Sequence, residues 1–422
     1  MSPSGYWPAS PWPVECGGNH RPKVTDLPGP ALGPTDHLVA NTRNNGRWNV
    51  MMVHRNPGEL FLCGTTLPHE STAACWVERI DAETLESLAH TGDLPAGGHA
   101  WPGGMAAHRN GDLYLVSGAY LHRVTPDCSV VASLPLPIDH AHDGLLILDD
   151  GMLVTKDVRL DAAGAASTLT VCDENLDVAT VVPLPEPSMG RLAAVGGYIY
   201  VAGTTRIFRY LWSGADLSLD PGWQPQYRQP ELGGVAGGLT VVDNRVWLMD
   251  NANVRAEPAE NGGALPADPP WSEPVRAIGV NADDADDLTV IRPTEHPAGW
   301  ATASPLVHDG VLVAWDTGGM GMAAFDIGGV GPAPEMLWFQ PFRTSMRPLL
   351  FPRSRELVIN DFRVLDDETS SDDLVVLDLE TGQMKARVPT GATEPGFLFL
   401  TPDEVGGLYV CSVNTISRIS AV

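Results

Sequence analysis

The chain has 422 residues, 43% of them apolar, so it can bury a large core and is long for one ordinary domain. Acidic residues outnumber basic ones by 52 to 26, which gives a formal charge of −26. Nucleic acids and anionic membranes bind basic patches, so this balance argues against both as partners.

The cysteines and the N-terminus bear on the cellular compartment. Scattered cysteines without a CxxC pair or metal-type spacing are typical of reduced thiols in a cytoplasmic protein. The N-terminus lacks the basic and apolar regions of a signal peptide, and no apolar stretch approaches the roughly 20 residues of a membrane span. We therefore predict a soluble, cytoplasmic protein. The six cysteines are Cys16, Cys63, Cys75, Cys128, Cys172 and Cys411.

A short template recurs along the chain: a polar or glycine-containing turn followed by an apolar strand. Most copies begin about 40 to 53 residues apart, which is the period of a repeat architecture. An apolar run precedes most copies, and two strands joined by such a turn form a β-hairpin. The eight copies span residues 55–66, 108–120, 148–157, 194–205, 241–251, 307–318, 352–362 and 402–414.

A second pair of strands follows in most units and is clearest in residues 74–92 and 373–391. Each of these segments turns around an Asp-x-x-Thr motif. Residues 81–90 also allow a short helix, but the equivalent later segment contains Thr-Gly and alternates, so both are predicted to be hairpins.

Four strands per unit, eight units and almost no helical periodicity predict an all-β, eight-bladed β-propeller, with a seven-bladed ring as the alternative. The last unit shows only three strands before Val422. A strand within residues 36–53 is expected to complete it and to hide the open edge. This divides the chain into an N-terminal extension, 1–35, and a single propeller domain, 36–422.

Two segments resemble known propeller families. "LVVLDLETGQMKARVPTGATEPGFLFL" (374–400) resembles the repeat of the YVTN and quinoprotein-like propellers. "GGLYVCSVNTISRI" (406–419) resembles the strands of the SMP-30/gluconolactonase and NHL group. The resemblance concerns the fold, and fold alone carries no activity. It implies that the loop entering each inner strand and the loop leaving the second strand share one face around a central channel.

On this connectivity, polar and aromatic side chains from several units meet at the channel mouth. The tryptophans among them could line a pocket for an apolar or aromatic ligand. The predicted substrate-binding residues are His99, Trp101, Tyr120, Lys156, Arg191, His296, Trp300 and Arg347.

The segment "DHAHD" (139–143) supplies the predicted catalytic residues His140, His142 and Asp143. The two histidines could act as general acid or base, or they could ligate zinc, iron or manganese with a third ligand from another blade. They could also be ordinary loop residues bonded to the backbone. A carboxylate such as Asp143 or Asp157 beside the imidazole is expected to raise its pKa.

Four carboxylates occupy nearly equivalent positions at the ends of second strands: Asp157, Asp250, Asp316 and Asp361. If they converge on the channel, a divalent cation would relieve their repulsion, and calcium takes about six to eight oxygen ligands of this kind. The resemblance to SMP-30-like enzymes, which bind a divalent ion on the axis, likewise implies a divalent cation at this position. Alternatively, each carboxylate accepts hydrogen bonds from its own loop amides.

Residues 251–274, rich in Pro, Ala and acidic residues, are long for a hairpin connection. They are predicted to form a lid over the same face, or else an exposed insertion.

These observations favour an enzyme that acts on a small organic substrate in an axial pocket. The reaction would be hydrolysis of a lactone-like or ester-like bond, with or without a divalent cation, or His-mediated proton transfer in a lyase or isomerase without metal. The sequence contains no GxSxG or HExxH motif. The competing class is a non-enzymatic propeller that binds a protein partner. A deep polar pocket would favour the enzyme, and an exposed apolar patch would favour the scaffold.

Overall fold

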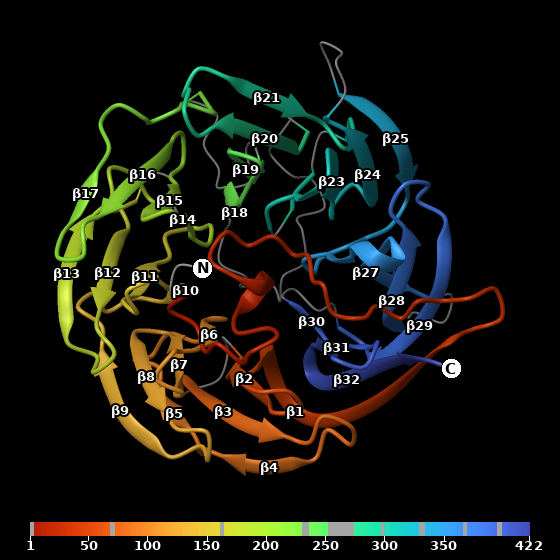
Figure 1. Cartoon of the computed structure of the whole chain (residues 1–422), viewed down its shortest axis with the longest axis horizontal. Coiled ribbons are helices and arrows are strands. Elements are labelled where there is room, and N and C mark those ends of the chain that lie inside the picture. Colours follow the sequence, from red (N-terminus) through yellow and green to blue (C-terminus); the bar gives the residue numbers. More distant parts are fainter. Residues whose placement is uncertain are drawn as a thin grey trace.

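The computed structural model of the chain describes residues 4–67, 72–160, 164–229, 236–251, 274–296, 299–301, 303–328, 334–365, 369–394 and 399–422. These residues are folded as antiparallel β-sheets, arranged in a ring around a central axis (Figure 1). The helices within them are two short 3-10 turns, η1 (Glu15–Gly17) and η3 (Pro352–Ser354). The predicted all-β propeller is therefore confirmed.

Six of the sheets have four strands each, and every one is a meander of consecutive strands. The first strand of each lies nearest the axis and the fourth lies at the rim (Figure 1). The sheets are β6 (Gly104–Ala107), β7 (Leu113–Ser117), β8 (Tyr120–Val124) and β9 (Val130–Pro135); β10 (His142–Ile147), β11 (Leu153–Asp157), β12 (Thr168–Cys172) and β13 (Val178–Pro183); β14 (Ala193–Val195), β15 (Tyr198–Ala202), β16 (Ile207–Trp212) and β17 (Leu217–Leu219); β18 (Ala236–Val242), β19 (Arg245–Asp250), β20 (Arg276–Asn281) and β21 (Leu288–Ile291); β22 (Leu306–His308), β23 (Val311–Asp316), β24 (Gly321–Asp326) and β25 (Glu335–Gln340); β26 (Leu349–Phe351), β27 (Glu356–Val364), β28 (Ser370–Asp378) and β29 (Met384–Ala392).

The seventh sheet joins the two ends of the ring and has eight strands. Its strands are β30 (Leu400–Pro402), β31 (Leu408–Cys411), β32 (Val413–Ala421), β1 (Leu38–His54), β2 (Leu60–Thr65), β3 (Ala74–Ile80) and β4 (Ser87–His90), with β5 (Leu94–Pro95) beside β3. The first half of β1 pairs with β32 and its second half pairs with β2. Counted as sheets, the described residues form seven units, as in the seven-bladed alternative.

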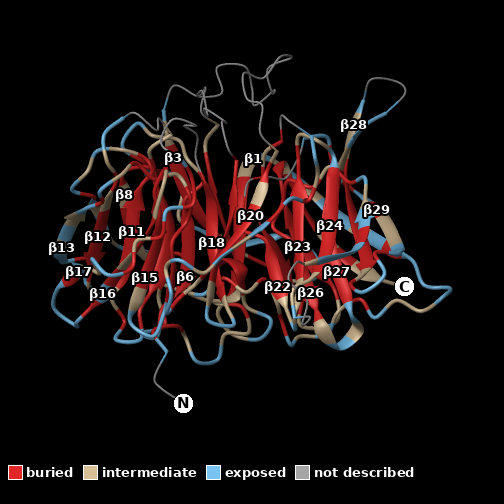
Figure 2. Ribbon diagram, turned by 90° about the horizontal axis from the view of Figure 1, so that it is seen from above, coloured by how far each residue is buried: buried red, intermediate tan, exposed pale blue. Residues whose placement is uncertain are grey.

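Burial follows the strand position within each sheet. Every residue of β7 is buried, whereas the rim strand β9 alternates between exposed and half-buried residues. Figure 2 shows the same gradient, with buried strands inside and exposed loops at both faces. Continuous apolar runs therefore form the inner strands because sheets cover both of their sides, and alternating runs form the rim.

Residues 81–90 form a hairpin rather than a helix. The Asp81 carboxylate accepts hydrogen bonds from the amides of Glu83 and Thr84 at 3.0 and 2.8 Å. Asp378 accepts equivalent bonds from Glu380 and Thr381 at 3.1 and 3.0 Å. The Asp-x-x-Thr motif thus makes the same Asx turn twice, and both segments are hairpins, as the sequence predicted.

Two faces of the ring can now be distinguished. On the entry face the chain enters each inner strand and leaves each second strand; on the hairpin face short turns join these two strands. None of the helices in the described part of the chain is long and apolar enough to cross a membrane.

The N-terminal extension packs along the inner strands from the hairpin face. Val14 forms a bridge to Ala106 in β6, and Val24 forms one to Leu350 in β26. The amide of Val241 in β18 donates to the His20 carbonyl at 2.9 Å. Residues 5–26 therefore cross the axis, and Figure 1 shows this segment near the centre of the ring. The boundary at residue 36 stays a prediction.

All six cysteines are free thiols, and all are buried. This agrees with the absence of CxxC pairs in the sequence.

Candidate active site

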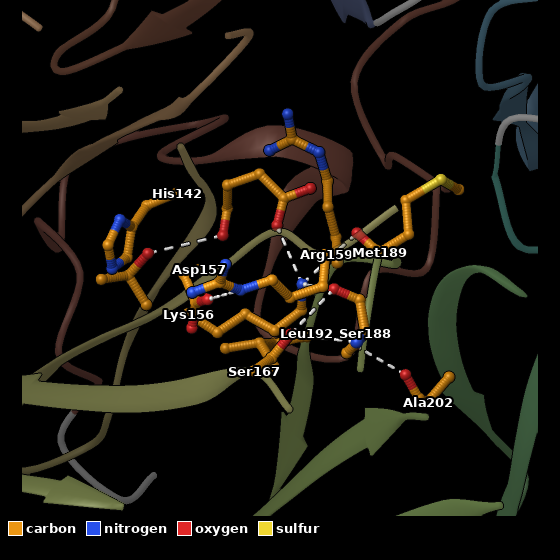
Figure 3. A network of polar contacts seen from close by, with 12 residues as sticks. His142, Lys156, Asp157, Arg159, Ser167, Ser188, Met189, Leu192 and Ala202 are labelled. Carbon is orange, nitrogen blue, oxygen red and sulfur yellow. Dashed lines mark hydrogen bonds and ion pairs between the residues drawn. The ribbon is translucent and has the colours of Figure 1, made fainter. Parts of the chain in front are cut away.

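The predicted catalytic segment lies on the entry face at the start of β10. The register of β10 and β11 sets His142 opposite Asp157 and Asp143 opposite Lys156. Residues that enter the inner strand and residues that leave the second strand are therefore neighbours, as the connectivity implied. Figure 3 shows His142, Lys156 and Asp157 in one polar network.

His142 is fully buried, and its hydrogen bonding fixes its tautomer. Its Nδ1 lies 2.9 Å from the carbonyl oxygen of His140. A carbonyl only accepts, so Nδ1 carries the hydrogen and the neutral ring keeps a lone pair on Nε2. Within the described part of the chain, Nε2 is buried without a hydrogen-bond partner. Burial lowers the pKa of His142, which keeps the ring neutral.

The pKa of His142 therefore moves opposite to the expectation from its carboxylate neighbours. Asp157 and Asp143 do favour the charged ring, but desolvation is the larger effect. The sequence could place carboxylates beside the histidine, but it could not show that the ring would be fully enclosed.

Lys156 belongs to the same network. Its Nζ lies 3.4 Å from Asp143 Oδ1 and donates to the carbonyl oxygens of Ser188 and Met189 at 3.1 and 3.3 Å (Figure 3). Lys156 is fully buried, and burial lowers its pKa. The bonds tie the sheet that begins with β10 to the loop before β14, so the network spans two neighbouring sheets.

His140 and His99 form the less buried rim of this site. Their rings stack with centroids 5.5 Å apart. His99 Nε2 lies 3.1 Å from Asp139 Oδ1, an ion pair when the ring is protonated. Burial and the nearby Arg159 guanidinium lower the pKa of His140. The structure therefore brings together two predicted substrate-binding residues, His99 and Lys156, and all three predicted catalytic residues.

The other aromatic and histidine residues predicted to bind substrate lie in separate units of the ring. The carbonyl of Trp101 accepts a bond from Ser117 Oγ at 3.5 Å, and the Tyr120 ring stacks on His122 at 5.8 Å. The Trp300 amide donates to Asp316 Oδ1 at 3.1 Å. His296 is exposed on the loop before β22. These contacts hold each residue within its own unit.

The four predicted metal ligands each bond to separate partners in their own surroundings. Asp157 pairs with Arg159 at 2.6 Å, and Asp361 pairs with Arg387 at 2.8 Å. Asp250 forms ion pairs with Arg228 and Arg276. Asp316 accepts bonds from Thr294 Oγ1 and from the Gly319 amide, both at 2.8 Å.

The structure does not bring these four carboxylates together. Across the residues that the structure describes, no three His, Cys, Asp or Glu side chains are grouped so that they could hold a metal ion. The arrangement is the alternative in which strand-end carboxylates bond to their own surroundings. Among the described residues, only Asn251 and Pro274 belong to the predicted lid, 251–274; residues 252–273 lie outside the described part of the chain.

The sequence analysis identified only part of a second charged cluster. Arg191 and Arg347, predicted to bind substrate, meet the N-terminal extension at the axis. The Glu15 carboxylate pairs with Arg21 and, at 2.7 Å, with Arg191. The Arg347 guanidinium lies 4.2 Å from the centre of the Phe399 ring. The signal that could have indicated this cluster is the scarcity of lysine: only three occur in the chain, and Lys23 and Lys156 are both buried.

The hairpin face carries a groove of about 1030 Å³ between the N-terminal extension and the hairpin turns of three sheets. Its lining includes Trp7, Asp149, Tyr200, Trp212 and Asp243. This groove lies across the molecule from the predicted catalytic residues.

No family model matches the chain, and no curated protein matches it. Several solved structures, in contrast, match the chain. The chain is similar to the Dos1 propeller (TM-score 0.56, 9% identity, covering 90% of this chain and 94% of that one). It is also similar to the WD40 domain of Pan2 from Neurospora crassa (TM-score 0.51, 9% identity, 92% and 96% covered). Virginiamycin B lyase from Staphylococcus aureus aligns with a TM-score of 0.47 at 10% identity, with 91% and 99% covered. The likeness to the first two shows the fold.

Proposed function

We propose that the protein is an enzyme that acts on a small organic substrate by proton transfer at His142. The observation that carries the proposal is the Nε2 lone pair of His142. Within the described residues it has no partner, although the other ring nitrogen is held by a backbone carbonyl. A buried polar atom without a partner costs free energy, so its retention calls for a role.

The neighbours of His142 supply the rest of the acid–base chemistry. With its pKa lowered, the ring is an unprotonated base at neutral pH. Lys156 places a buried ammonium group in the same network, where it would stabilise negative charge that develops on the substrate. This pairing suits removal of a proton next to a carbonyl, as in a lyase or isomerase. It also suits activation of a water against a lactone or ester.

The proposed reaction does not depend on a divalent cation held by Asp157, Asp250, Asp316 and Asp361. Each of these carboxylates already accepts bonds from arginine or from its own loop. We infer further that the eight-stranded sheet is two blades sharing β1, which makes the ring eight-bladed. Its support is that β1 pairs with β32 from Leu38 to Trp48 and with β2 from Trp48 to His54.

The competing function, a propeller that binds a protein partner, has one observation in its favour. The rim strand β25 exposes Met336, Leu337 and Phe339, with 49%, 42% and 47% of their surface accessible. Exposed apolar groups on a rim strand are typical of interaction surfaces. Replacing Phe339 with serine would impair such a partner's binding and leave any turnover unchanged.

His142→Gln tests the proposed function. The purified protein is screened for turnover of lactones, esters and carbonyl compounds by mass spectrometry, and the variant is then assayed on the substrate found. Loss of the base is expected to reduce the rate by about 10²–10⁴-fold. His90→Gln, in the rim strand β4, is the matched control and is expected to keep wild-type turnover. Wild-type turnover in His142→Gln would contradict the proposal.

The tautomer can be tested before a substrate is known. The ¹⁵N chemical shifts of His142 at neutral pH should show a protonated Nδ1 and a bare Nε2. A protonated Nε2 would remove the base on which the proposed function rests.

A further inference from the structure

The groove on the hairpin face has no part in the proposed reaction. It runs between the N-terminal extension and the hairpin turns of three successive sheets, which begin with β10, β14 and β18 (Figure 1). Its volume of about 1030 Å³ reaches the upper end of the range of small-molecule pockets, about 300–1,000 Å³. The groove is therefore large enough for a ligand that contacts several turns at once.

Most of the groove lining is apolar. Four aromatic side chains border it, Tyr6 and Trp7 from the extension and Tyr200 and Trp212 from the sheet that begins with β14. At the end of β14, Val195 lines the groove with 44% of its surface accessible. Apolar and aromatic groups left accessible at the edge of a groove are typical of a binding surface.

The turn in the middle of the groove carries no side chain of its own. Gly196 and Gly197 join β14 to β15 with φ of +59° and +82°, a left-handed conformation that favours glycine. A Cβ added to Gly196 would meet no atom within 4 Å. A ligand chain can therefore pass close to the backbone at this point.

The charged side chains of the lining are acidic at neutral pH. Asp149 and Asp150 stand in the turn between β10 and β11, and Asp243 stands in the turn between β18 and β19. The described lining includes no lysine or arginine. Its one histidine, His20, is neutral near pH 7 because partial burial and the nearby Lys23 lower its pKa. Carboxylates thus lie on both sides of the glycine turn.

Two of these carboxylates are available to a ligand. Asp150 accepts a hydrogen bond from the Trp212 indole at 2.6 Å. The side chains of Asp149 and Asp243 are exposed, and neither has a hydrogen bond or ion pair within the described part of the chain. Arg109 donates to the main-chain carbonyls of Asp149, at 3.1 Å, and Asp150 rather than to their carboxylates.

We propose that this groove binds a basic peptide segment of a partner protein in an extended conformation. Its arginine or lysine side chains would pair with Asp149 and Asp243, and its backbone would cross the glycine turn. Charge complementarity selects a cationic ligand, and the net charge of −26 attracts such a ligand to the protein. The aromatic border favours arginine, whose guanidinium group stacks on aromatic rings.

The placement of the two carboxylates favours a peptide over a small cation. Asp149 and Asp243 belong to different sheets, and a third sheet lies between them in the ring. A ligand that pairs with both must span the intervening turn, which a peptide with two spaced basic residues can do. This proposal does not rest on the proposed function, because the groove lies across the molecule from His142.

Binding is measured on the full chain by fluorescence anisotropy. The probes are labelled seven-residue peptides in which two arginines are separated by one, three or five glycines. At least one spacing should bind with a dissociation constant below about 100 µM in about 50 mM salt, and more weakly as the salt concentration rises. Peptides with glutamine in place of both arginines should not bind.

Asp149→Asn combined with Asp243→Asn removes both carboxylates and keeps the side-chain shape. Asparagine also suits the left-handed backbone at Asp243, where φ is +51°. This double variant should weaken peptide binding about 10-fold or more. Its control is Asp309→Asn combined with Glu295→Gln, which removes two exposed charges outside the groove. Asp309 begins the turn between β22 and β23 with φ of +46°, as Asp243 begins its own turn.

Val195→Lys tests the path across the middle of the groove. The new side chain would occupy this path and repel a basic peptide, so binding should fall at least about 10-fold. Val195 is exposed, so the fold should be kept. Val290→Lys, at a position of β21 that is 50% exposed, is the control and should bind the peptides as the wild type does.

Four results would overturn the proposal. They are no binding of any arginine peptide, wild-type affinity in either groove variant, an equal loss in the controls, and binding of spermidine as tight as that of the best peptide. The last result would assign the groove to a small cation. Because His142→Gln should leave peptide binding unchanged, this proposal and proton transfer by His142 can fail separately.

Discussion

His122 shows what full enclosure does to a single titratable residue. It lies in β8, with Nδ1 2.8 Å from Ser133 Oγ and Nε2 3.0 Å from the Pro95 carbonyl oxygen. Burial lowers its pKa to about 4, against about 6.5 for an exposed histidine. The ring is therefore neutral in the folded protein, although it would accept a proton in the unfolded chain at mildly acidic pH.

This difference predicts acid sensitivity at a defined pH. Because the folded pKa is the lower one, the contribution of His122 to stability is complete above pH 6.5. It is lost as the pH falls from there to about 4. The shift corresponds to about 3 kcal/mol. Urea unfolding at several pH values gives the free energy of unfolding as a function of pH. In His122→Gln, most of the decrease between pH 6.5 and 4 should be absent.

His90→Gln, at an exposed histidine of β4, should keep the wild-type slope. An unchanged pH dependence in His122→Gln would mean that His122 titrates normally.

For the strand-end carboxylates, the sequence could predict their position in the fold but not their bonding partners. Their position after the second strand predicted that they lie on the entry face. Their partners could not be predicted, because Asp250 meets Arg228 and Arg276, which lie 22 and 26 residues away. A spacing pattern identifies a carboxylate as a possible metal ligand. It cannot show whether the folded chain places an arginine against that carboxylate instead.

At the scale of elements, the N-terminal extension behaves as part of the core. Trp12 and Val14 are buried among the sheets, and the segment is joined to the ring through Glu15. The hairpins could be predicted because their turns and apolar strands recur. This extension could not, because it has no repeat and nearly all of its contacts are distant in sequence.

Glu15→Gln tests the importance of this connection. The substitution keeps the shape of the side chain but leaves Arg21 and Arg191 buried without their carboxylate. Breaking a buried pair in this way typically costs about 3–5 kcal/mol, so chemical denaturation should show a loss of that size.

Glu295→Gln, at a side chain that is 80% exposed, should change the free energy of unfolding by no more than about 1 kcal/mol. Equal stability of Glu15→Gln and the wild type would show that the extension is not held by this ion pair.

The whole molecule is closed by one strand. β1 pairs with β32, the last strand of the chain, and with β2, so the two ends of the ring share a sheet. The sequence predicted such a strand because the last unit lacked one of its four. Sheets that close a ring have no open edge, and their stability should therefore be coupled around the circle.

Ile419→Ala tests this coupling. Ile419 is fully buried in β32, opposite Ala40 of β1 and Leu408 of β31, and truncating it should cost about 2–5 kcal/mol. Because closure joins the sheets, hydrogen exchange should accelerate not only in β32 but also in β2 and β27, on either side of the closing strands. Val405→Ala, at a side chain that is 75% exposed, should leave all three strands as protected as in the wild type. Faster exchange confined to β31 and β32 would show that the ring opens locally at its seam and that the two halves of β1 are independent.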